Sequence, residues 1–337
     1  MSGSYRRCWV RCVAVLGLLA GLISPTFALE KVRVGVLEFG TVNWEMDVIQ
    51  THKLAEQQGI ELEVVRLASA DASTVALQGG AVDMIVSDWV WVARQRAAGQ
   101  DYTLFPYSNA VGELLVKADS PIKTLADLKG KKLGVAGGAS DKSWLLLRAV
   151  AQQTQKLDLQ AETEPQYAAP PLLNELMQRG DLDAVLNFWN YAARLKAAGM
   201  RSIITVPDTL EGLGIQRDLP LIGWVFSEKW AQEHAASVNG FLKASYAAKQ
   251  KMQSDNAEWE RLRPRMKAED DAVFTALRDG FRAGIPACFG DKEKQAATDT
   301  FRILAEIGGE KLVGKATALD KGVFWAGFNL PDCTAKP

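Results

Sequence analysis

Short apolar runs alternate with amphipathic stretches of helical period from residue 29 to residue 226. The apolar runs are rich in Val, Ile and Leu and are bounded by Gly, Asp or Ser, which is typical of buried strands. Their alternation with helices predicts an α/β fold built on mostly parallel sheets. The predicted strands cover residues 31–37, 61–67, 82–86, 111–117, 132–136, 183–188, 201–206 and 221–226.

Helices are predicted between these strands, because helical periodicity there begins near capping residues and ends at glycines. Residues 160–167 are predicted to be extended, and residues 207–220, rich in Asp, Gly and Pro, are predicted to form a loop. The predicted helices cover residues 45–58, 72–78, 89–98, 144–150, 171–178 and 190–198.

The pattern changes after residue 227, where long amphipathic helices follow one another without strands between them. Two α/β units and a helical C-terminal part can form consecutive domains, or the second unit can be inserted into the first. We favour insertion through two hinge crossings, near 111–117 and 221–226, because such crossings leave a cleft between two lobes. The predicted lobes are 29–112 plus 225–337 and, inserted, 113–224. The C-terminal helices are predicted at residues 229–252, 257–263, 268–282 and 295–307.

The first 28 residues have the composition of a cleaved signal peptide. Three arginines precede an apolar run from Val13 to Ile23, and Thr26-Phe27-Ala28 has a small-x-small cleavage pattern. The apolar run is shorter than the roughly 20 residues that a bilayer span requires. A twin-arginine export signal is less favoured, because the residues after Arg7 do not resemble the usual continuation of that motif. Lipidation at Cys12 is less favoured, because this cysteine precedes the apolar run rather than following it. A periplasmic protein without membrane insertion of the mature chain is predicted.

Charge argues against nucleic acid as a partner. The chain carries 39 basic and 40 acidic residues, and loss of the three signal-peptide arginines leaves 36 basic ones. A slightly acidic mature protein lacks the basic excess that polyanion binders use. Of the four cysteines, Cys288 and Cys333 remain after cleavage. An oxidising compartment favours a disulfide between them, and two unpaired thiols are the alternative.

A glycine-rich helix start follows the strand at 132–136. Gly137 and Gly138 allow a sharp turn, and Ser140 is predicted to cap the next helix. Backbone N–H groups at a helix start carry partial positive charge, so this segment can hold an anion or a carbonyl-type oxygen without a catalytic residue.

Three segments resemble periplasmic solute-binding proteins of ABC importers, in particular their nitrate, sulfonate and taurine (NitT/TauT-like) branch. They are SPIKTLADLKGKKLGVAGGAS (120–140), the run ending VDMIVSD (80–88) and DLDAVLNFW (181–189). The resemblance implies a type II periplasmic-binding-protein-like fold that captures a small organic molecule between two lobes. It also implies a monomer that delivers this ligand to an ABC permease.

Carrying the family's cleft onto this chain places candidate ligand-binding residues at the carboxyl ends of strands. Helix starts there would orient polar atoms, and aromatic faces would hold a ring or a cation. The tryptophans could instead be core residues, and Asp88 and Ser140 could serve only as helix caps. The candidates are Phe39, Asn43, Trp44, Ser87, Asp88, Trp89, Asn109, Ser140, Lys142, Asn187, Trp189 and Asn190.

The charges in these loops indicate a ligand with an amine or a ring rather than an inorganic anion. Glu38 and Asp88 are acidic, Lys142 is the main cation, and the loops contain no arginine. Trp89→Ala and Trp189→Ala are each predicted to weaken ligand binding by about 1 kcal/mol or more without affecting the fold.

Enzyme motifs are weak, and no catalytic residue, cofactor or metal is predicted. Residues 309–315 (GEKLVGK) approach a phosphate-binding loop, but Ala316 replaces the required hydroxyl residue. His52 and His234 lie in polar helical stretches without metal-ligand spacing. The alternative function is an accessory or sensor protein of a periplasmic enzyme or receptor system, built on the same fold.

Overall fold

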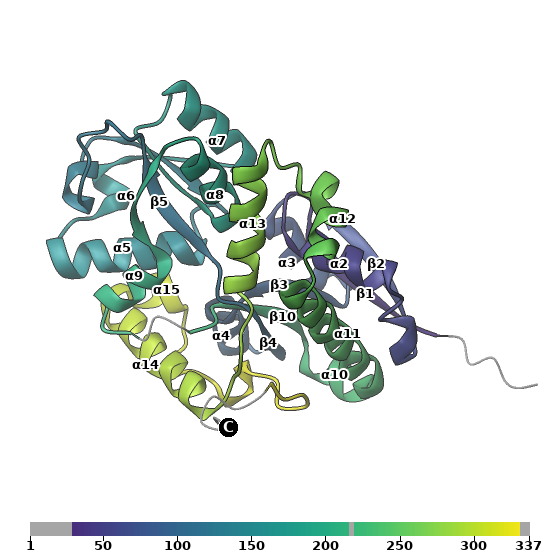
Figure 1. The fold of residues 1–337 in the computed structure, drawn as a ribbon. Helices are drawn as coiled ribbons and strands as arrows, with labels where there is room; N and C mark the ends of the chain where they lie inside the picture. Colours follow the sequence, from purple (N-terminus) through teal and green to yellow (C-terminus); the bar gives the residue numbers. More distant parts are fainter. Residues whose placement is uncertain (1–28, 216–218, 331–337) are drawn as a thin grey trace, which may run out of the picture.

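Two α/β lobes make up the protein, and C-terminal helices run along both of them (Figure 1). The computed structural model describes residues 29–215 and 219–330. The predicted signal peptide and Cys333 lie outside the described residues. Cys288 is disulfide-bonded, and its pairing with Cys333 stays a prediction.

The sheet of the first lobe has the strand order β2-β1-β3-β10-β4. β1 is parallel to both β2 and β3, whereas β10 is antiparallel to β3 and β4. The strand that returns from the second lobe therefore lies between two strands of the first. The bounds are β1 (Glu30–Leu37), β2 (Ile60–Leu67), β3 (Met84–Asp88), β4 (Tyr102–Ser108) and β10 (Ile222–Ser227).

The second lobe repeats this topology with the order β7-β6-β8-β5-β9. β6 is parallel to β7 and β8, and β5 is antiparallel to β8 and β9. The bounds are β5 (Gly112–Val116), β6 (Lys132–Ala136), β7 (Glu164–Ala168), β8 (Ala184–Phe188) and β9 (Arg201–Thr205).

Helices cover both sheets, and short 3₁₀ turns complete the connections (Figure 1). They are α2 (Val42–Thr51), η1 (Glu56–Gln58), α3 (Ala70–Gln78), α4 (Trp89–Ala97), η2 (Leu125–Leu128), α5 (Lys142–Gln155), α6 (Leu159–Glu162), α7 (Pro170–Arg179), α8 (Trp189–Ala197), α9 (Val206–Gly212), α10 (Glu228–Glu233), α11 (Ala235–Ser254), α12 (Asn256–Met266), α13 (Asp271–Ala283), α14 (Asp291–Gly308), α15 (Glu310–Val313) and η3 (Lys321–Val323).

The same local contact starts the third parallel strand in both lobes. The Arg33 N–H donates to Asp83 Oδ2 at 2.8 Å, and the Lys132 N–H donates to Asp183 Oδ2 at 2.9 Å. β3 with α4 and β8 with α8 are therefore equivalent units. This equivalence aligns Trp89 with Trp189 at the first position of each helix.

The predicted fold class, two α/β lobes joined by two crossings, is confirmed, but several local predictions were wrong. Residues 159–162 form α6 rather than an extended stretch, and residues 206–212 form α9 rather than a loop, because Thr205 and Asp208 make a capping box. The helix predicted at 229–252 is interrupted at His234. The helix predicted to reach residue 58 ends at Thr51. The strand β4 was not predicted.

The chain crosses between the lobes after β4 and again before β10. The predicted second boundary, between residues 224 and 225, cuts through β10, and that strand pairs within the first sheet over its whole length. Residues 222–224 therefore go with the first lobe. A Cβ on Gly223 would lie 2.4 Å from the Phe105 carbonyl oxygen, so only glycine fits where β10 passes β4.

The C-terminal helices contact both lobes. α13 packs against α8, and α14 packs against α5; Figure 1 shows α13 standing between the lobes. One apolar cluster joins Phe301 and Leu304 of α14 with Trp89 of the first lobe and Leu146 of the second. The crossings are therefore not the only connection between the lobes.

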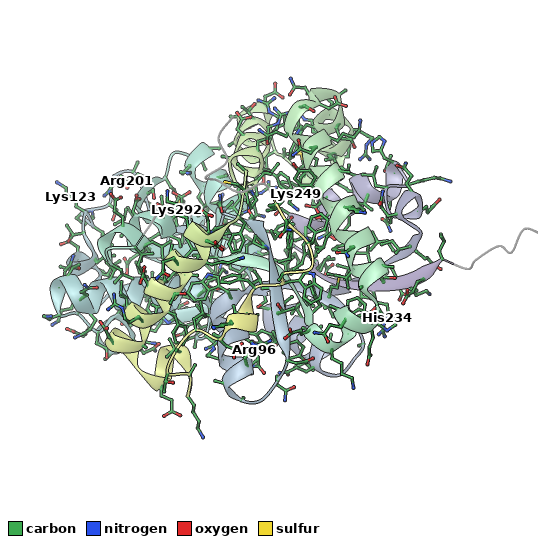
Figure 2. All side chains as sticks on the ribbon, turned by 90° about the horizontal axis from the view of Figure 1, so that it is seen from below. Arg96, Lys123, Arg201, His234, Lys249 and Lys292 are labelled. Atoms are coloured by element: carbon green, nitrogen blue, oxygen red, sulfur yellow. The ribbon has the colours of Figure 1, made fainter. Side chains whose placement is uncertain are left out.

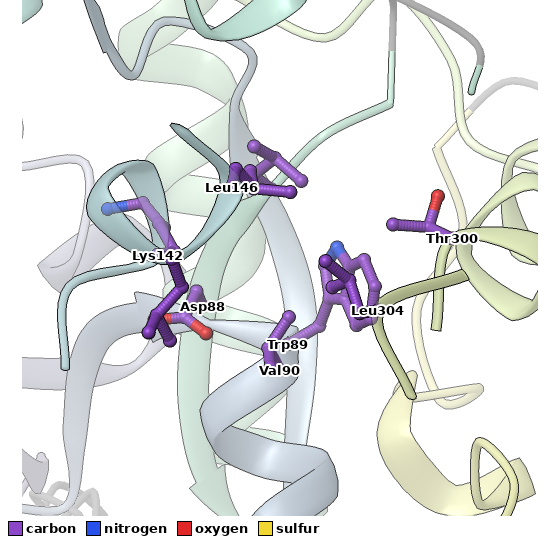
Figure 3. A pocket seen from close by; sticks show the side chains of 9 residues that line it. Asp88, Trp89, Val90, Lys142, Leu146, Thr300 and Leu304 are labelled. Atoms are coloured by element: carbon purple, nitrogen blue, oxygen red, sulfur yellow. The ribbon is translucent and has the colours of Figure 1, made fainter. Parts of the chain in front are cut away.

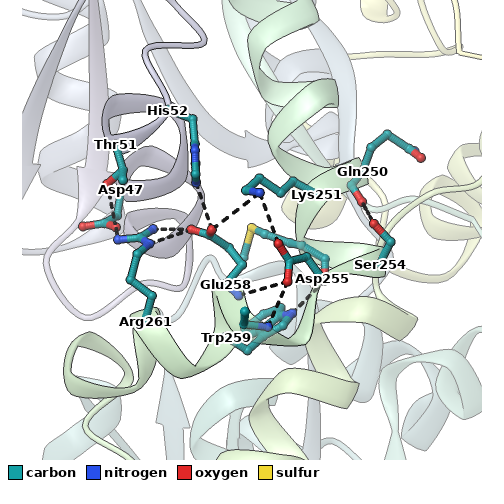
Figure 4. A network of polar contacts seen from close by, with 12 residues as sticks. Asp47, Thr51, His52, Gln250, Lys251, Ser254, Asp255, Glu258, Trp259 and Arg261 are labelled. Carbon is teal, nitrogen blue, oxygen red and sulfur yellow. Dashed lines mark hydrogen bonds and ion pairs between the residues drawn. The ribbon is translucent and has the colours of Figure 1, made fainter.

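A charged network joins α2 to α12 in the first lobe (Figure 4). The buried carboxylate of Glu258 lies 2.9 Å from His52 Nε2 and also accepts from Arg261, which in turn contacts Asp47. Burial raises the pKa of the Glu258 carboxyl, but the hydrogen bonds from Arg261 and His52 outweigh it. The net pKa lies below the ordinary value of 4.5.

This lowered pKa predicts a loss of stability in acid. A carboxylate that is more acidic in the folded state stabilises it above pH 4.5, and that contribution disappears as the pH falls through the folded-state pKa. Urea unfolding followed by circular dichroism should show the midpoint decreasing below pH 4.5. Glu258→Gln should be less stable at pH 7 and respond less to acid. An equal acid response in both proteins would contradict the assignment.

Candidate functional site

A cavity of about 360 Å³ lies between the two lobes. The N-terminal ends of α2, α3 and α4 line it from the first lobe, and those of α5 and α8 line it from the second. Each of these helices follows a strand or a strand-end loop, so its start faces the carboxyl edge of a sheet. Five helix starts thus converge on one space, and those without a capping carboxylate offer partial positive charge to an anionic group.

Two of the five helix starts have no side-chain cap. Ser69, Asp88 and Asp141 cap α3, α4 and α5, whereas no side chain caps α2 or α8. Among the described residues, no acceptor serves the N–H groups of Val42 and Asn190. These two donors, one from each lobe, are available to a ligand.

Asp141, rather than the predicted Ser140, is the cap of α5. Its Oδ1 accepts from the Ser143 N–H at 2.8 Å, while Ser140 lies exposed at the cavity. The prediction of Ser140 as a cap was wrong because the Gly137–Gly138 turn delays the helix until residue 142.

Two cations line the cavity, Arg94 and Lys142. Lys142 Nζ lies 3.6 Å from Asp141 Oδ2. Within residues 29–215 and 219–330, the Arg94 guanidinium has neither a hydrogen-bond acceptor nor an ion-pair partner. The prediction that the site lacks arginine was restricted to the loops, and it missed Arg94 because this residue lies in the second turn of α4.

A second space of about 240 Å³ adjoins this cavity, sharing Gly40, Asp71 and Phe188 with it. Phe39 and Tyr167 are each 40% exposed there, one from each lobe. We call this space the apolar annex; its apolar side chains are Leu37, Phe39, Ala68, Ala70, Tyr167, Ala168, Ala169, Pro170 and Phe188.

A buried ion pair lies beneath the cavity wall. Lys249 Nζ lies 2.6 Å from Glu45 Oε2 and 4.0 Å from the ring centroid of Tyr107, which lines the cavity. Ser245 bonds both charged groups and accepts from Trp224 Nε1 at 3.1 Å. Lys249, labelled in Figure 2, is only 6% exposed. The buried ring of Tyr107 therefore packs directly against the Lys249 ammonium group.

The structure brings six of the predicted site residues together at the main cavity. These are Ser87, Asp88, Ser140, Lys142, Trp189 and Asn190. Phe39 lies in the annex, and Trp44 lines a third, outer space of about 410 Å³ together with Asn43.

Three predicted asparagines have structural contacts. Asn43 Nδ2 donates to the Leu37 and Gly40 carbonyls and shapes the loop before α2. Asn187 is buried and bonds Pro170 and Asn174. Asn109 lies on the first crossing, where its N–H donates to the Gly284 carbonyl at 2.8 Å. Neither Asn109 nor Asn187 lines the main cavity.

Trp89 belongs to the core, in contrast to the equivalent Trp189. Its side chain is 0% exposed and packs where α4, α5 and α14 meet. Figure 3 shows its indole facing Leu304, around a space of only about 10 Å³. The expectation that Trp89 forms a wall of the ligand site is therefore corrected, because α14 covers this tryptophan.

Trp89→Ala is expected to lower the free energy of unfolding by about 3–5 kcal/mol, the usual cost of deleting a buried aromatic ring. Trp189→Ala should cost less, because Trp189 is only partly buried. Urea unfolding of both variants and of Trp230→Ala, a partly exposed control, provides the measurement. Wild-type stability of Trp89→Ala would show that the ring is not part of the core.

Sequence reasoning missed several cavity residues that lie inside helices rather than at their starts. Trp91 and Arg94 follow Asp88 at helical spacing on α4, so the period of 3.6 could have placed them on one face. The missed polar and aromatic residues are Asp71, Ser73, Thr74, Trp91, Arg94, Gln95, Tyr107 and Ser108.

Within the described ranges, no cluster of three or more His, Cys, Asp or Glu side chains could hold a metal ion. A membrane-spanning helix is likewise absent from this part of the chain, since none there combines sufficient length with sufficient apolar character.

Comparisons with known proteins agree with this architecture. A putative aliphatic sulfonates-binding protein of Escherichia coli is 32% identical over 197 residues, which cover 54% of this chain and 59% of that relative. The E. coli periplasmic aliphatic sulphonate-binding protein SsuA superposes with a TM-score of 0.68 at 20% identity, over 91% of this chain and 96% of that one. The alkanesulfonate-binding protein SsuA of Xanthomonas axonopodis pv. citri, solved bound to MOPS, gives 0.65 at 20% identity, over 85% and 97%.

The fold is thus that of periplasmic binding proteins, as the sequence resemblance implied. The family model described as NMT1/THI5 like matches residues 44–258, which include the starts of α3, α4, α5 and α8 at the cavity but not β1 or the start of α2. The chain belongs to the NMT1/THI5-like family.

Proposed function

We propose that this protein is a solute-binding protein that captures a small organic molecule between its lobes and delivers it to an ABC permease. The observation that carries the proposal is the cavity of about 360 Å³ whose walls come from helix starts of both lobes. A ligand there contacts both lobes only when they are closed, so its binding favours the closed form. The accessory or sensor role is not favoured by the relatives, which are named as binding proteins.

The ligand that fits this site carries an anionic group and an apolar part. Arg94, Lys142 and the free N–H groups of Val42 and Asn190 supply donors for an anion. The apolar annex, with Phe39 and Tyr167, accommodates a ring or an aliphatic chain. Of the predicted amine or ring, the proposal keeps the ring and replaces the amine with an anionic group, because Arg94 was absent from the earlier reasoning. Sulfonates, which all three related proteins described above are named for binding, have this chemistry.

The mature protein acts in the periplasm as a monomer and has no catalytic role in this proposal. The permease is the macromolecular partner, and the domain division at the two crossings provides the hinge.

Native mass spectrometry of freshly purified protein tests the proposal. We expect a retained small molecule whose mass is lost after unfolding and refolding, and calorimetry should then show binding of that compound or of the sulfonate probe MOPS. Protein that retains nothing, and binds neither MOPS nor alkanesulfonates or aromatic carboxylates, would argue against solute capture.

A further inference from the structure

Arg194 of α8 makes polar contacts that cross from the second lobe to the first. Its Nη1 donates to the Lys267 carbonyl at 2.9 Å, and its Nη2 donates to the Met266 carbonyl at 2.6 Å. Glu269, in the turn between α12 and α13, also accepts from this guanidinium. α8 packs on the second sheet, whereas α12 packs on α2 and α11 of the first lobe.

The acceptors are the carbonyl groups at the end of α12. The last carbonyls of a helix lack intrahelical donors and carry partial negative charge. Lys267 has φ 49°, the left-handed conformation that ends the helix. A planar guanidinium can donate to two such carbonyls at once, which a lysine ammonium cannot do with the same geometry. The Arg194 side chain is only 14% exposed.

The surrounding contact is tight and apolar. A Cβ on Gly280 of α13 would lie 2.8 Å from the Trp189 ring of α8. The same ring meets Trp44 of the first lobe edge-on, with the centroids 6.2 Å apart. Arg194 thus lies on α8 about one and a half turns after the helix start that lines the ligand cavity. It lies where α8 of the second lobe meets α13 and the end of α12, and we call this contact the seam.

We propose that Arg194 is a latch that holds the two lobes closed. The latch deepens the proposed function, on which its biological meaning rests. When the seam opens, water replaces the α12 carbonyls around the guanidinium, and no charge is left buried. The bonds therefore bias closure without preventing release of the ligand. Arg194 acts through lobe position, so it is a positioning residue and does not contact the ligand.

The test compares the full mature protein with Arg194→Ala and Arg194→Lys. Arg179→Ala is the matched control, since Arg179 pairs with Asp181 on the surface of the same lobe. The measurements are small-angle scattering and hydrogen–deuterium exchange of the α8 and α13 amides, with thermal unfolding to monitor the fold. We expect Arg194→Ala to have a larger radius of gyration and roughly tenfold faster exchange confined to the seam. Arg194→Lys should lie in between, and Arg179→Ala should match the wild type.

Two results would overturn the latch. One is wild-type dimensions and seam exchange in both Arg194 variants. The other is faster exchange throughout the second lobe with a lower melting temperature, which identifies Arg194 as a residue of the fold alone. Retention of a small molecule is measured separately on the wild type. If the wild type neither retains nor binds a small molecule, but Arg194→Ala still has a larger radius of gyration and faster seam exchange, the proposed function is contradicted and the latch is supported.

Discussion

Replacing Arg94 with alanine is expected to weaken binding of an organic anion by about 2 kcal/mol, roughly thirtyfold in Kd. The guanidinium lines the cavity, is half-buried and has no partner among the described residues. A bound anion would supply that partner, and the alanine variant would leave the anion with fewer donors in a site shielded from water. Because Lys142 already contacts Asp141, it cannot fully replace the missing charge.

Calorimetric titration with the compound retained by the purified protein, or with MOPS, measures this loss. Arg94→Lys keeps the charge and should lose less affinity than Arg94→Ala. Arg302→Ala, which removes an exposed arginine of α14 paired with Glu306, is the control. Binding by Arg94→Ala with wild-type affinity would remove this residue from the site and reopen the expectation of a ligand with an amine.

Lys249→Met is expected to lower the free energy of unfolding by about 3–5 kcal/mol. The substitution leaves the Glu45 carboxylate, which is 0% exposed, without the ammonium group 2.6 Å away. Burial lowers the pKa of Lys249, and Glu45 opposes this shift through its charge and its hydrogen bond. Each charge therefore makes burial of the other tolerable.

The double variant Glu45→Leu/Lys249→Met distinguishes a lost pair from lost packing. It should regain most of the stability, because an apolar pair of similar volume leaves no charge buried. Urea unfolding by circular dichroism gives both values, with Lys243→Met, which replaces an exposed lysine on the same helix, as a control. A double variant as unstable as Lys249→Met would mean that the ion pair itself is not the source of the stability.

The elements that local sequence specifies were predicted well. The strand at 132–136 and the strand near 31–37 were placed within a residue, because an apolar run bounded by glycines and a strict polar–apolar alternation are both local signals of a strand. The capping box that forms α9 was overlooked, although its Thr205–Asp208 spacing is a local signal. The positions of the helix starts that form the cavity could also be predicted from local sequence, because each follows a predicted strand.

The sequence by itself determined the two α/β units, the family resemblance and the general position of a site at strand ends. Only the tertiary structure decided which of two equivalent tryptophans faces the cavity. Trp89 and Trp189 begin the same unit, but α14 covers Trp89, whereas Trp189 borders the space between the lobes. Packing by a helix more than 200 residues away, like the hydrogen bonds of Arg194 to the end of α12, depends on long-range contacts that no local pattern encodes.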